Sequence, residues 1–120
     1  MKYADIKNML SAIDDATLKL ELIMDLGNSL ENVPENASCT EIIGCSSFVE
    51  ICRTDNRFYG RADSAIVRGI VAVFIAMLDG KTVDEIKKID IADEFNSLNL
   101  NLGAGRLNGV NSMIRFFKNL

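Results

Sequence analysis

The amino-acid sequence predicts an α+β domain, in which a small antiparallel sheet packs against several helices. Three observations lead to this fold class: helical spacing of apolar residues near the start, two adjacent strand-like segments in the middle, and helical patterns again after them. At 120 residues, we expect a single domain, 1–120, with one hydrophobic core.

Two helices are predicted before the strands. Apolar residues in 6–13 recur at helical spacing. Asp14 and Asp15 are suited to begin a second helix, because short acidic side chains accept hydrogen bonds from free backbone N–H groups. Leucines at every fourth position from Leu18 to Leu30 would line its inner face. The polar stretch 31–38, which holds the only proline, reads as a loop.

The sheet is expected in the middle of the chain. Ser47–Arg53 is rich in Phe, Val and Ile, and Arg57–Gly60 is a shorter strand-like segment. The turn Thr54-Asp55-Asn56 suits a hairpin between them. Asp63 or Ser64 should then cap a helix that is apolar nearly all round, which indicates burial from several sides.

Three more helices are predicted after that central one, which ends near Leu78. Residues 82–85 fit a capping box at the start of a short helix through Ile89. A further short helix covers 92–98. Gly103-Ala104-Gly105 is expected to be a flexible joint, and a last helix follows from about Arg106.

Composition excludes several classes of function. A net charge of −4, with a pI near 4.8, argues against nucleic-acid binding. The longest apolar run, 70–78, is too short to span a bilayer, and the first residues do not form a signal peptide, so we expect a cytoplasmic protein. Histidine is absent, which excludes Ser–His and Cys–His nucleophile pairs and imidazole-dependent zinc sites.

Three cysteines, Cys39, Cys45 and Cys52, lie within 14 residues. An odd count in a reducing compartment argues against a disulfide framework. Cys45 follows Gly44, which permits a left-handed backbone, so its side chain can be presented by a loop. The hydroxyls of Ser46 and Ser47, together with loop N–H groups, could stabilise a thiolate, the form that attacks sulfur. The alternative is that Cys45 is a small buried hydrophobe.

Four segments in order resemble the SufE family of sulfur acceptor proteins. They are Leu22–Leu30, Ile42–Val49 around Cys45, Gly60–Gly69, and Arg106–Ile114. The family fold is in turn similar to that of IscU-type iron–sulfur scaffolds. The resemblance therefore implies a SufE/IscU-like fold over most of the chain.

The resemblance also implies a function. Cys45 would take a persulfide sulfur from a cysteine desulfurase of the SufS or CsdA type, stimulate that enzyme, and pass the sulfur on to an iron–sulfur scaffold. Pyridoxal phosphate would belong to the partner, so we expect no cofactor and no metal on this chain. Arg106 matches an arginine near the family's cysteine, where a guanidinium could stabilise an anionic sulfur. Asp63 matches a family acid, and helix capping is an equally good role for it.

Two other functions remain open. One is a scaffold that binds an iron–sulfur cluster or zinc through Cys39, Cys45 and Cys52. The other is a non-catalytic module that only regulates a partner enzyme. Cys39 could also resolve or share sulfur with Cys45, although Cys39 and Cys52 are more simply explained as incidental surface or core residues.

Overall fold

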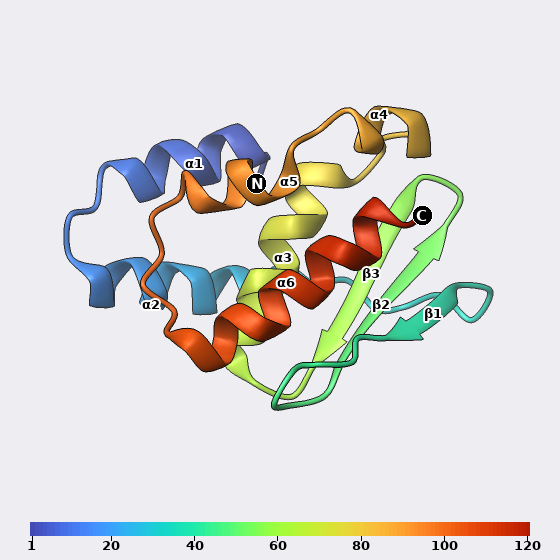
Figure 1. Cartoon of the computed structure of the whole chain (residues 1–120), viewed down its shortest axis with the longest axis horizontal. Coiled ribbons are helices and arrows are strands. Elements are labelled where there is room, and N and C mark those ends of the chain that lie inside the picture. The colour runs from blue at the N-terminus through green and yellow to red at the C-terminus, as the bar shows by residue number, and fades with distance from the viewer.

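A computed structural model describes residues 1–120 and confirms the α+β class, with six α-helices and a three-stranded antiparallel sheet. The sheet lies at one end of the long axis and the α1–α2 pair lies at the other (Figure 1). The helices are α1 (Tyr3–Ser11), α2 (Ala16–Leu26), α3 (Ala65–Leu78), α4 (Val83–Lys87), α5 (Ile91–Asn96) and α6 (Ala104–Lys118), with a 3-10 turn at Gly27–Ser29. The strands are β1 (Ser38–Glu41), β2 (Val49–Thr54) and β3 (Arg57–Ala62).

The start of α2 follows the sequence prediction, but its inner face does not. The Asp15 carboxylate accepts hydrogen bonds from the N–H groups of Thr17 and Leu18, as expected of a cap. However, Leu18 is exposed, whereas Ile23 is fully buried. A strict four-residue spacing drifts by about 40° per step around a helix of 3.6 residues per turn, so these leucines do not share one face.

The sheet has the order β1-β2-β3, and all neighbours are antiparallel. The predicted hairpin between β2 and β3 is confirmed, with Thr54 paired to Arg57 around the two-residue turn Asp55–Asn56. Asp55 has a positive φ of 48°, a conformation that Asp tolerates better than most residues. Strand β1 was not predicted, because all four of its residues are exposed and show no apolar alternation.

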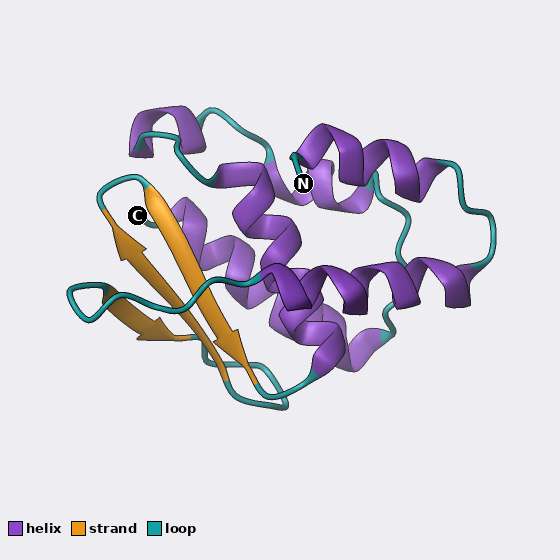
Figure 2. Ribbon diagram, turned by 180° about the vertical axis from the view of Figure 1, so that it is seen from behind, coloured by secondary structure: helices purple, strands orange, loops and turns teal.

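Helix α3 runs through the centre of the molecule, and Figure 2 shows it between the sheet and the α1–α2 pair. Nine of its 14 residues are buried, which confirms the expected burial from several sides. It packs closely on α2 at Gly69, where a Cβ atom would collide with the backbone carbonyl of Ile23. Its N-cap is Ser64, one of the two residues predicted for this position, although no side-chain hydrogen bond caps the helix.

The C-terminal third contains the predicted helices with shifted boundaries. Both capping-box bonds between Thr82 and Glu85 are present at the start of α4. The segment 103–105 is not a joint: Gly103, with φ of 82°, is the N-cap of α6, and the next two residues form its first turn. Helix α6 reaches the sheet through the edge-to-face pair of Phe117 with Phe58.

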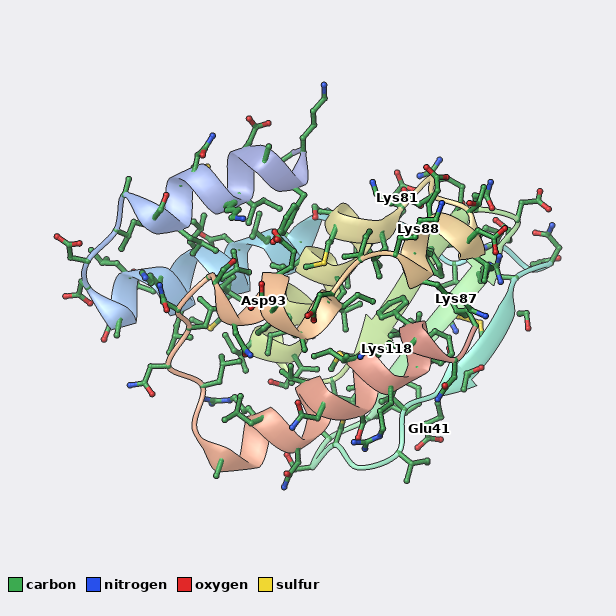
Figure 3. All side chains as sticks on the ribbon, turned by 45° about the horizontal axis from the view of Figure 1, so that its top comes forward. Glu41, Lys81, Lys87, Lys88, Asp93 and Lys118 are labelled. Atoms are coloured by element: carbon green, nitrogen blue, oxygen red, sulfur yellow. A yellow bond between two sulfur atoms is a disulfide. The ribbon has the colours of Figure 1, made fainter.

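Most charged side chains point away from the core, including the lysines on and beside α4 and Lys118 near the end of α6 (Figure 3). A core of 25 buried apolar residues draws on all six helices and on strands β2 and β3. None of the helices combines the length and the apolar character needed to cross a membrane.

Candidate functional site

Cys45 lies on the loop between β1 and β2, and backbone hydrogen bonds fix both ends of this loop. At its start, the Ile42 N–H donates to the Val49 carbonyl at 2.8 Å. At its end, the Asp63 N–H donates to the Phe48 carbonyl at 3.2 Å. Gly44 has a φ of +103°, so the expected left-handed backbone before Cys45 is confirmed. The loop therefore holds a defined conformation that a residue with a side chain would rarely adopt at position 44.

The Cys45 side chain packs against the backbone of helix α6. A Cβ atom added at Gly109 would lie only 2.8 Å from the Cys45 Sγ and 3.6 Å from its Cα. A Cβ at Gly44 would in turn lie 2.5 Å from the Ser112 Oγ. The loop and the helix thus approach each other at two glycines, one from each side, and any larger residue would separate them.

A small cavity of about 20 Å³ adjoins Cys45. Its walls come from the Cys45 loop, from α3 and from α6: Cys45, Ser46, Ser47, Val67, Ile70, Gly105, Arg106, Gly109 and Met113. This volume is enough for about one water-sized particle, whereas a site for a small-molecule substrate needs several hundred Å³. The cavity accommodates a single added atom beside the thiol rather than a bound metabolite.

The surroundings of Cys45 are mainly apolar. Cys45 is half-buried and is the one free cysteine of the chain. Burial raises the pKa of its thiol, because a thiolate loses solvation there. No carboxylate lines the cavity, and Arg106 is its one charged residue, with a guanidinium Nη1 that donates to the Leu102 carbonyl at 3.4 Å. At rest the cysteine is therefore a protonated, sheltered thiol with one cation nearby.

The structure brings most of the predicted site residues together. Ser46, Ser47 and Arg106 line the same cavity as Cys45, and Gly44 shapes the loop. Asp63 is an exception, because its side chain is exposed, does not line the cavity and makes no hydrogen bond. Its contribution to the loop is through its backbone N–H alone, which any residue except proline could provide.

Other residues at the site were not predicted. Gly109 and Ser112 face the loop from α6. Ser112 is the one buried polar residue, and its hydroxyl donates to the Asn108 carbonyl and accepts from Arg115. Val67 and Ile70 supply the apolar wall from α3. Gly109 lies inside an otherwise regular helix, three residues before Ser112, and such a glycine beside a small polar residue is the signal that could have indicated a close contact.

The other two cysteines form a disulfide, which corrects the expectation that the cysteines stay unpaired. Cys39 and Cys52 are directly opposite each other on β1 and β2, with a Cα–Cα distance of 4.0 Å. They lie on the sheet face away from the helices, since Ile51 and its partner Gly60 face α3. The three cysteines are thus not brought together as one ligand set, and Cys39 is not placed to resolve a sulfur on Cys45.

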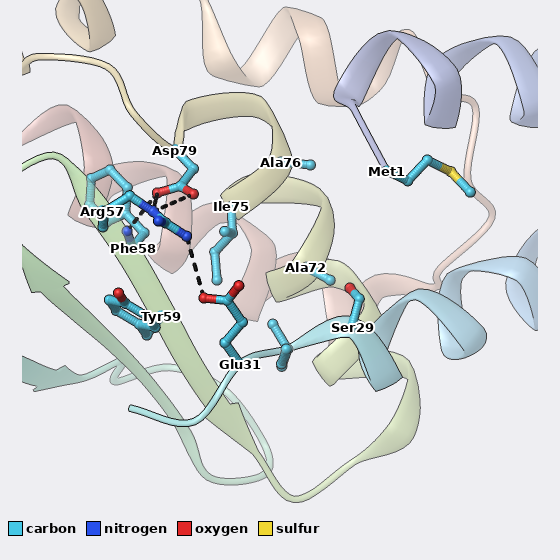
Figure 4. A pocket seen from close by; sticks show the side chains of 11 residues that line it. Met1, Ser29, Glu31, Arg57, Phe58, Tyr59, Ala72, Ile75, Ala76 and Asp79 are labelled. Carbon is cyan, nitrogen blue, oxygen red and sulfur yellow. Dashed lines mark hydrogen bonds and ion pairs between the residues drawn. The ribbon is translucent and has the colours of Figure 1, made fainter. Parts of the chain in front are cut away.

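A hollow of about 220 Å³ between β3 and the second half of α3 is a structural feature rather than a reactive site (Figure 4). Arg57 crosses it and donates to the carboxylates of Asp79 and Glu31 at 2.9 and 3.3 Å. Asp79 also accepts from the Phe58 N–H, so it ties the end of α3 to β3. These charges are already paired, and no cysteine lines the hollow.

Nearly the whole chain matches one known protein family. Residues 4–120 match the family model named SufE, described as an Fe-S metabolism associated domain. The match covers the Cys45 loop, helix α3 and helix α6, the elements that form the cavity described above.

Individual relatives agree with the family match. An uncharacterized SufE-like protein of Rhizobium meliloti is 33% identical over 118 residues, which covers 88% of this chain and 84% of the relative. The cysteine desulfuration protein SufE of Wigglesworthia glossinidia brevipalpis is 30% identical over 122 residues, with 94% and 84% covered. The sulfur acceptor protein CsdE of Escherichia coli is 34% identical over 102 residues, with 78% and 69% covered.

Proposed function

We propose, from the premise that this chain belongs to the SufE family of Fe-S metabolism associated domains, that Cys45 accepts sulfur from a cysteine desulfurase. The donor is the persulfide of a pyridoxal-phosphate enzyme of the SufS or CsdA type. The protein stimulates that enzyme and delivers the sulfur to iron–sulfur cluster assembly. Relatives named for cysteine desulfuration and for sulfur acceptance support this role.

The transfer is a thiol exchange without net oxidation. The Cys45 thiolate attacks the terminal sulfur of the donor persulfide, and a new S–S bond forms at the Cys45 Sγ. The S–S bond of the donor breaks, and the donor cysteine leaves as a thiolate that takes up the proton Cys45 has lost. Such exchange needs access and a thiolate rather than a histidine base, which agrees with the absence of histidine.

The observation that carries the proposal is a free thiol beside a cavity of single-atom size. The chain offers one unpaired cysteine, and next to it a space of about 20 Å³. One added sulfur atom is on the scale of this space, whereas cysteine or pyridoxal phosphate is far larger. The small cavity therefore favours a carrier of sulfur over an enzyme that binds the amino acid itself.

The neighbours of Cys45 have complementary roles in this proposal. The apolar wall keeps the resting thiol protonated, which protects it from oxidation because thiolates oxidise more readily. Docking of the desulfurase exposes the loop and lets the thiolate form. Arg106 then stabilises the anionic sulfur, and Gly44, Ser46 and Ser47 set the loop conformation around it.

The direct test is the intact mass of the protein after incubation with a SufS-type or CsdA-type desulfurase, cysteine and pyridoxal phosphate. We expect a gain of roughly 32 Da, one sulfur atom, with peptide mapping to Cys45. Cys45→Ser should lose this gain, whereas the matched double variant Cys39→Ser/Cys52→Ser should keep it. A gain that survives in Cys45→Ser would refute the assignment of Cys45.

Desulfurase stimulation separates a carrier from a regulator. If sulfur transfer through Cys45 drives the stimulation, Cys45→Ser should bind the desulfurase and fail to raise its turnover. Full stimulation by Cys45→Ser would instead mean that the chain acts on its partner by binding alone.

A further inference from the structure

A second sulfur site lies on the outer face of the sheet. Cys39, Cys52 and Glu50 place one ligand atom each within 4.8 Å of one another. The register accounts for this grouping, since Cys39 is opposite Cys52 and Glu50 is two residues before Cys52 on the same strand face. Rigid neighbouring strands therefore hold two sulfur atoms and a carboxylate together.

A hydrogen bond orients the carboxylate of this cluster. The Glu50 Oε1 accepts from the Arg61 Nη1 at 2.7 Å, and the Glu50 side chain is only 21% exposed. The other carboxylate oxygen of Glu50, Oε2, makes no hydrogen bond to Arg61 and remains available as a metal ligand. A neighbour that fixes a ligating carboxylate in this way is typical of metal sites, where it sets the direction of the ligand.

The charges suit a divalent cation. With both cysteines deprotonated, two thiolates and one carboxylate carry three negative charges. Arg61 offsets one of them, and a divalent ion offsets the other two. Two thiolates favour a thiophilic ion such as Zn²⁺ over Mg²⁺ or Ca²⁺, which prefer oxygen ligands.

The two sulfur atoms differ in access. Cys39 is exposed on the four-residue edge strand β1, whereas Cys52 is fully buried. A thiolate of an incoming dithiol therefore attacks the Cys39 Sγ, and the Cys52 sulfur leaves as a thiolate. The second thiol of the reductant then displaces Cys39, so the reductant becomes a disulfide and the protein gains two electrons and two protons.

We propose that the reduced Cys39–Cys52 pair and Glu50 form a redox-gated binding site for one thiophilic divalent cation, exemplified by Zn²⁺. Binding releases the two thiol protons and leaves a fourth coordination position open to water. Thiolates on tetrahedral zinc lie about 3.8 Å apart, a spacing that rotation of side chains on directly facing strands can supply. The disulfide form has no thiolates and does not bind the ion.

The site is separate from Cys45 in both position and chemistry. Cys45 does not belong to the cluster of ligand atoms, and it contacts α6 on the other side of the sheet. Metal binding at the pair therefore should not depend on the sulfur acceptance proposed for Cys45. Bound metal would hold β1 to β2 much as the disulfide does.

The test is an anaerobic Co²⁺ titration of the Cys45→Ser variant, reduced with a phosphine and desalted, beside the same protein with its disulfide intact. Cobalt reports on thiolate ligands through a charge-transfer band in the near ultraviolet. We expect one equivalent bound with this band in the reduced protein, displacement by Zn²⁺, and no band in the oxidised protein. This comparison of two redox states requires no mutation in the proposed site.

Three variants assign the ligands. Cys39→Ser and Cys52→Ser should each abolish the thiolate band, and Glu50→Gln should weaken Co²⁺ binding by about tenfold or more. Absence of the band in protein shown by thiol counting to be reduced would overturn the proposal. So would a band that persists in Cys39→Ser. Because the background lacks Cys45, these outcomes are independent of any failure in sulfur acceptance.

Discussion

The Cys45 loop and the Cys39–Cys52 pair place sulfur in opposite surroundings only a few residues apart in the sequence. Cys45 faces α6 and an apolar cavity with one arginine, so its thiol is isolated and its pKa is raised. The pair lies on the outer face of the sheet, next to a carboxylate and the arginine bound to it. The reactivity of each cysteine in this chain therefore depends on its neighbours in the fold rather than on its place in the sequence.

The two regions are nevertheless connected through the chain. The disulfide joins residues 13 apart, and Cys45 lies within the loop that it closes. The disulfide therefore fixes the base of the β1–β2 hairpin, which is the paired strands themselves. The tip of the hairpin is the loop that carries Gly44 and Cys45, and it packs against Gly109 and Ser112 of α6. Changes at the base should act on stability, whereas changes at the tip should act on sulfur acceptance.

Loss of the crosslink should give the largest effect on stability. Reduction of the Cys39–Cys52 disulfide should lower the free energy of unfolding by about 3 kcal/mol, because the unfolded chain regains the freedom of a loop of this length. Urea denaturation of oxidised and reduced protein, both without added metal, measures this change. Cys45→Ser in the oxidised protein is the control and should change stability by less than about 1 kcal/mol. Equal free energies of unfolding in the two redox states would contradict the prediction that the Cys39–Cys52 disulfide stabilises the fold.

At the tip, two glycines of α6 form a matched pair. A Cβ at Gly109 would lie 2.8 Å from the Cys45 Sγ, whereas a Cβ at Gly105 would meet nothing within 4 Å. Alanine raises the helix preference at both positions, so the crowding of Cys45 is the main difference between the two variants. We expect Gly109→Ala to be less stable than Gly105→Ala by about 1–3 kcal/mol and to slow sulfur acceptance. Thermal unfolding and the mass assay would test this, and matching values for both variants would contradict the close contact.

The sequence predicts those elements of the fold that have a local pattern of apolar or capping residues. Apolar periodicity and caps predict most of the helices, including the bonds made by Asp15, Thr82 and Glu85. Strand β1 gives no such signal, because an exposed edge strand buries nothing on either face. Leu18 was assigned to the core from spacing alone, which does not determine which side of a short helix is covered.

At the site, a feature set by neighbouring residues in the sequence was predicted, whereas contacts between distant residues were not. Gly44 and Cys45 are adjacent in sequence, so the need for a left-handed backbone could be predicted. The contact of Cys45 with Gly109 spans 64 positions and depends on where α6 packs. The disulfide was missed because its cysteines become neighbours only through β1, the strand that the sequence does not reveal.

The raised pKa of Cys45 gives a pH test of the tip region. The folded protein favours the neutral Cys45 thiol. The stability that this preference contributes is fully present at a pH below the pKa of Cys45 in the unfolded state. It is lost as the pH rises through the pKa of Cys45 in the folded state. In disulfide-intact protein, Cys45 is the one thiol available to iodoacetamide. The midpoint of its alkylation rate against pH should therefore be higher than that of the urea-unfolded protein. Equal midpoints, whatever the absolute rates, would mean that burial does not control this thiol.

The smallest expected effect belongs to Arg106, the one charged residue lining the cavity. An exposed pair of a cation and an anion is worth about 0.2–1 kcal/mol, so Arg106→Ala should slow sulfur acceptance by up to about fivefold. Arg106→Lys keeps the charge and should recover part of the rate. Lys118→Ala, near the other end of α6 (Figure 3), is the control and should leave the rate unchanged. Because Arg106 is exposed, none of these variants should alter unfolding by more than about 0.5 kcal/mol, and a rate in Arg106→Ala equal to that in Lys118→Ala would remove Arg106 from the site.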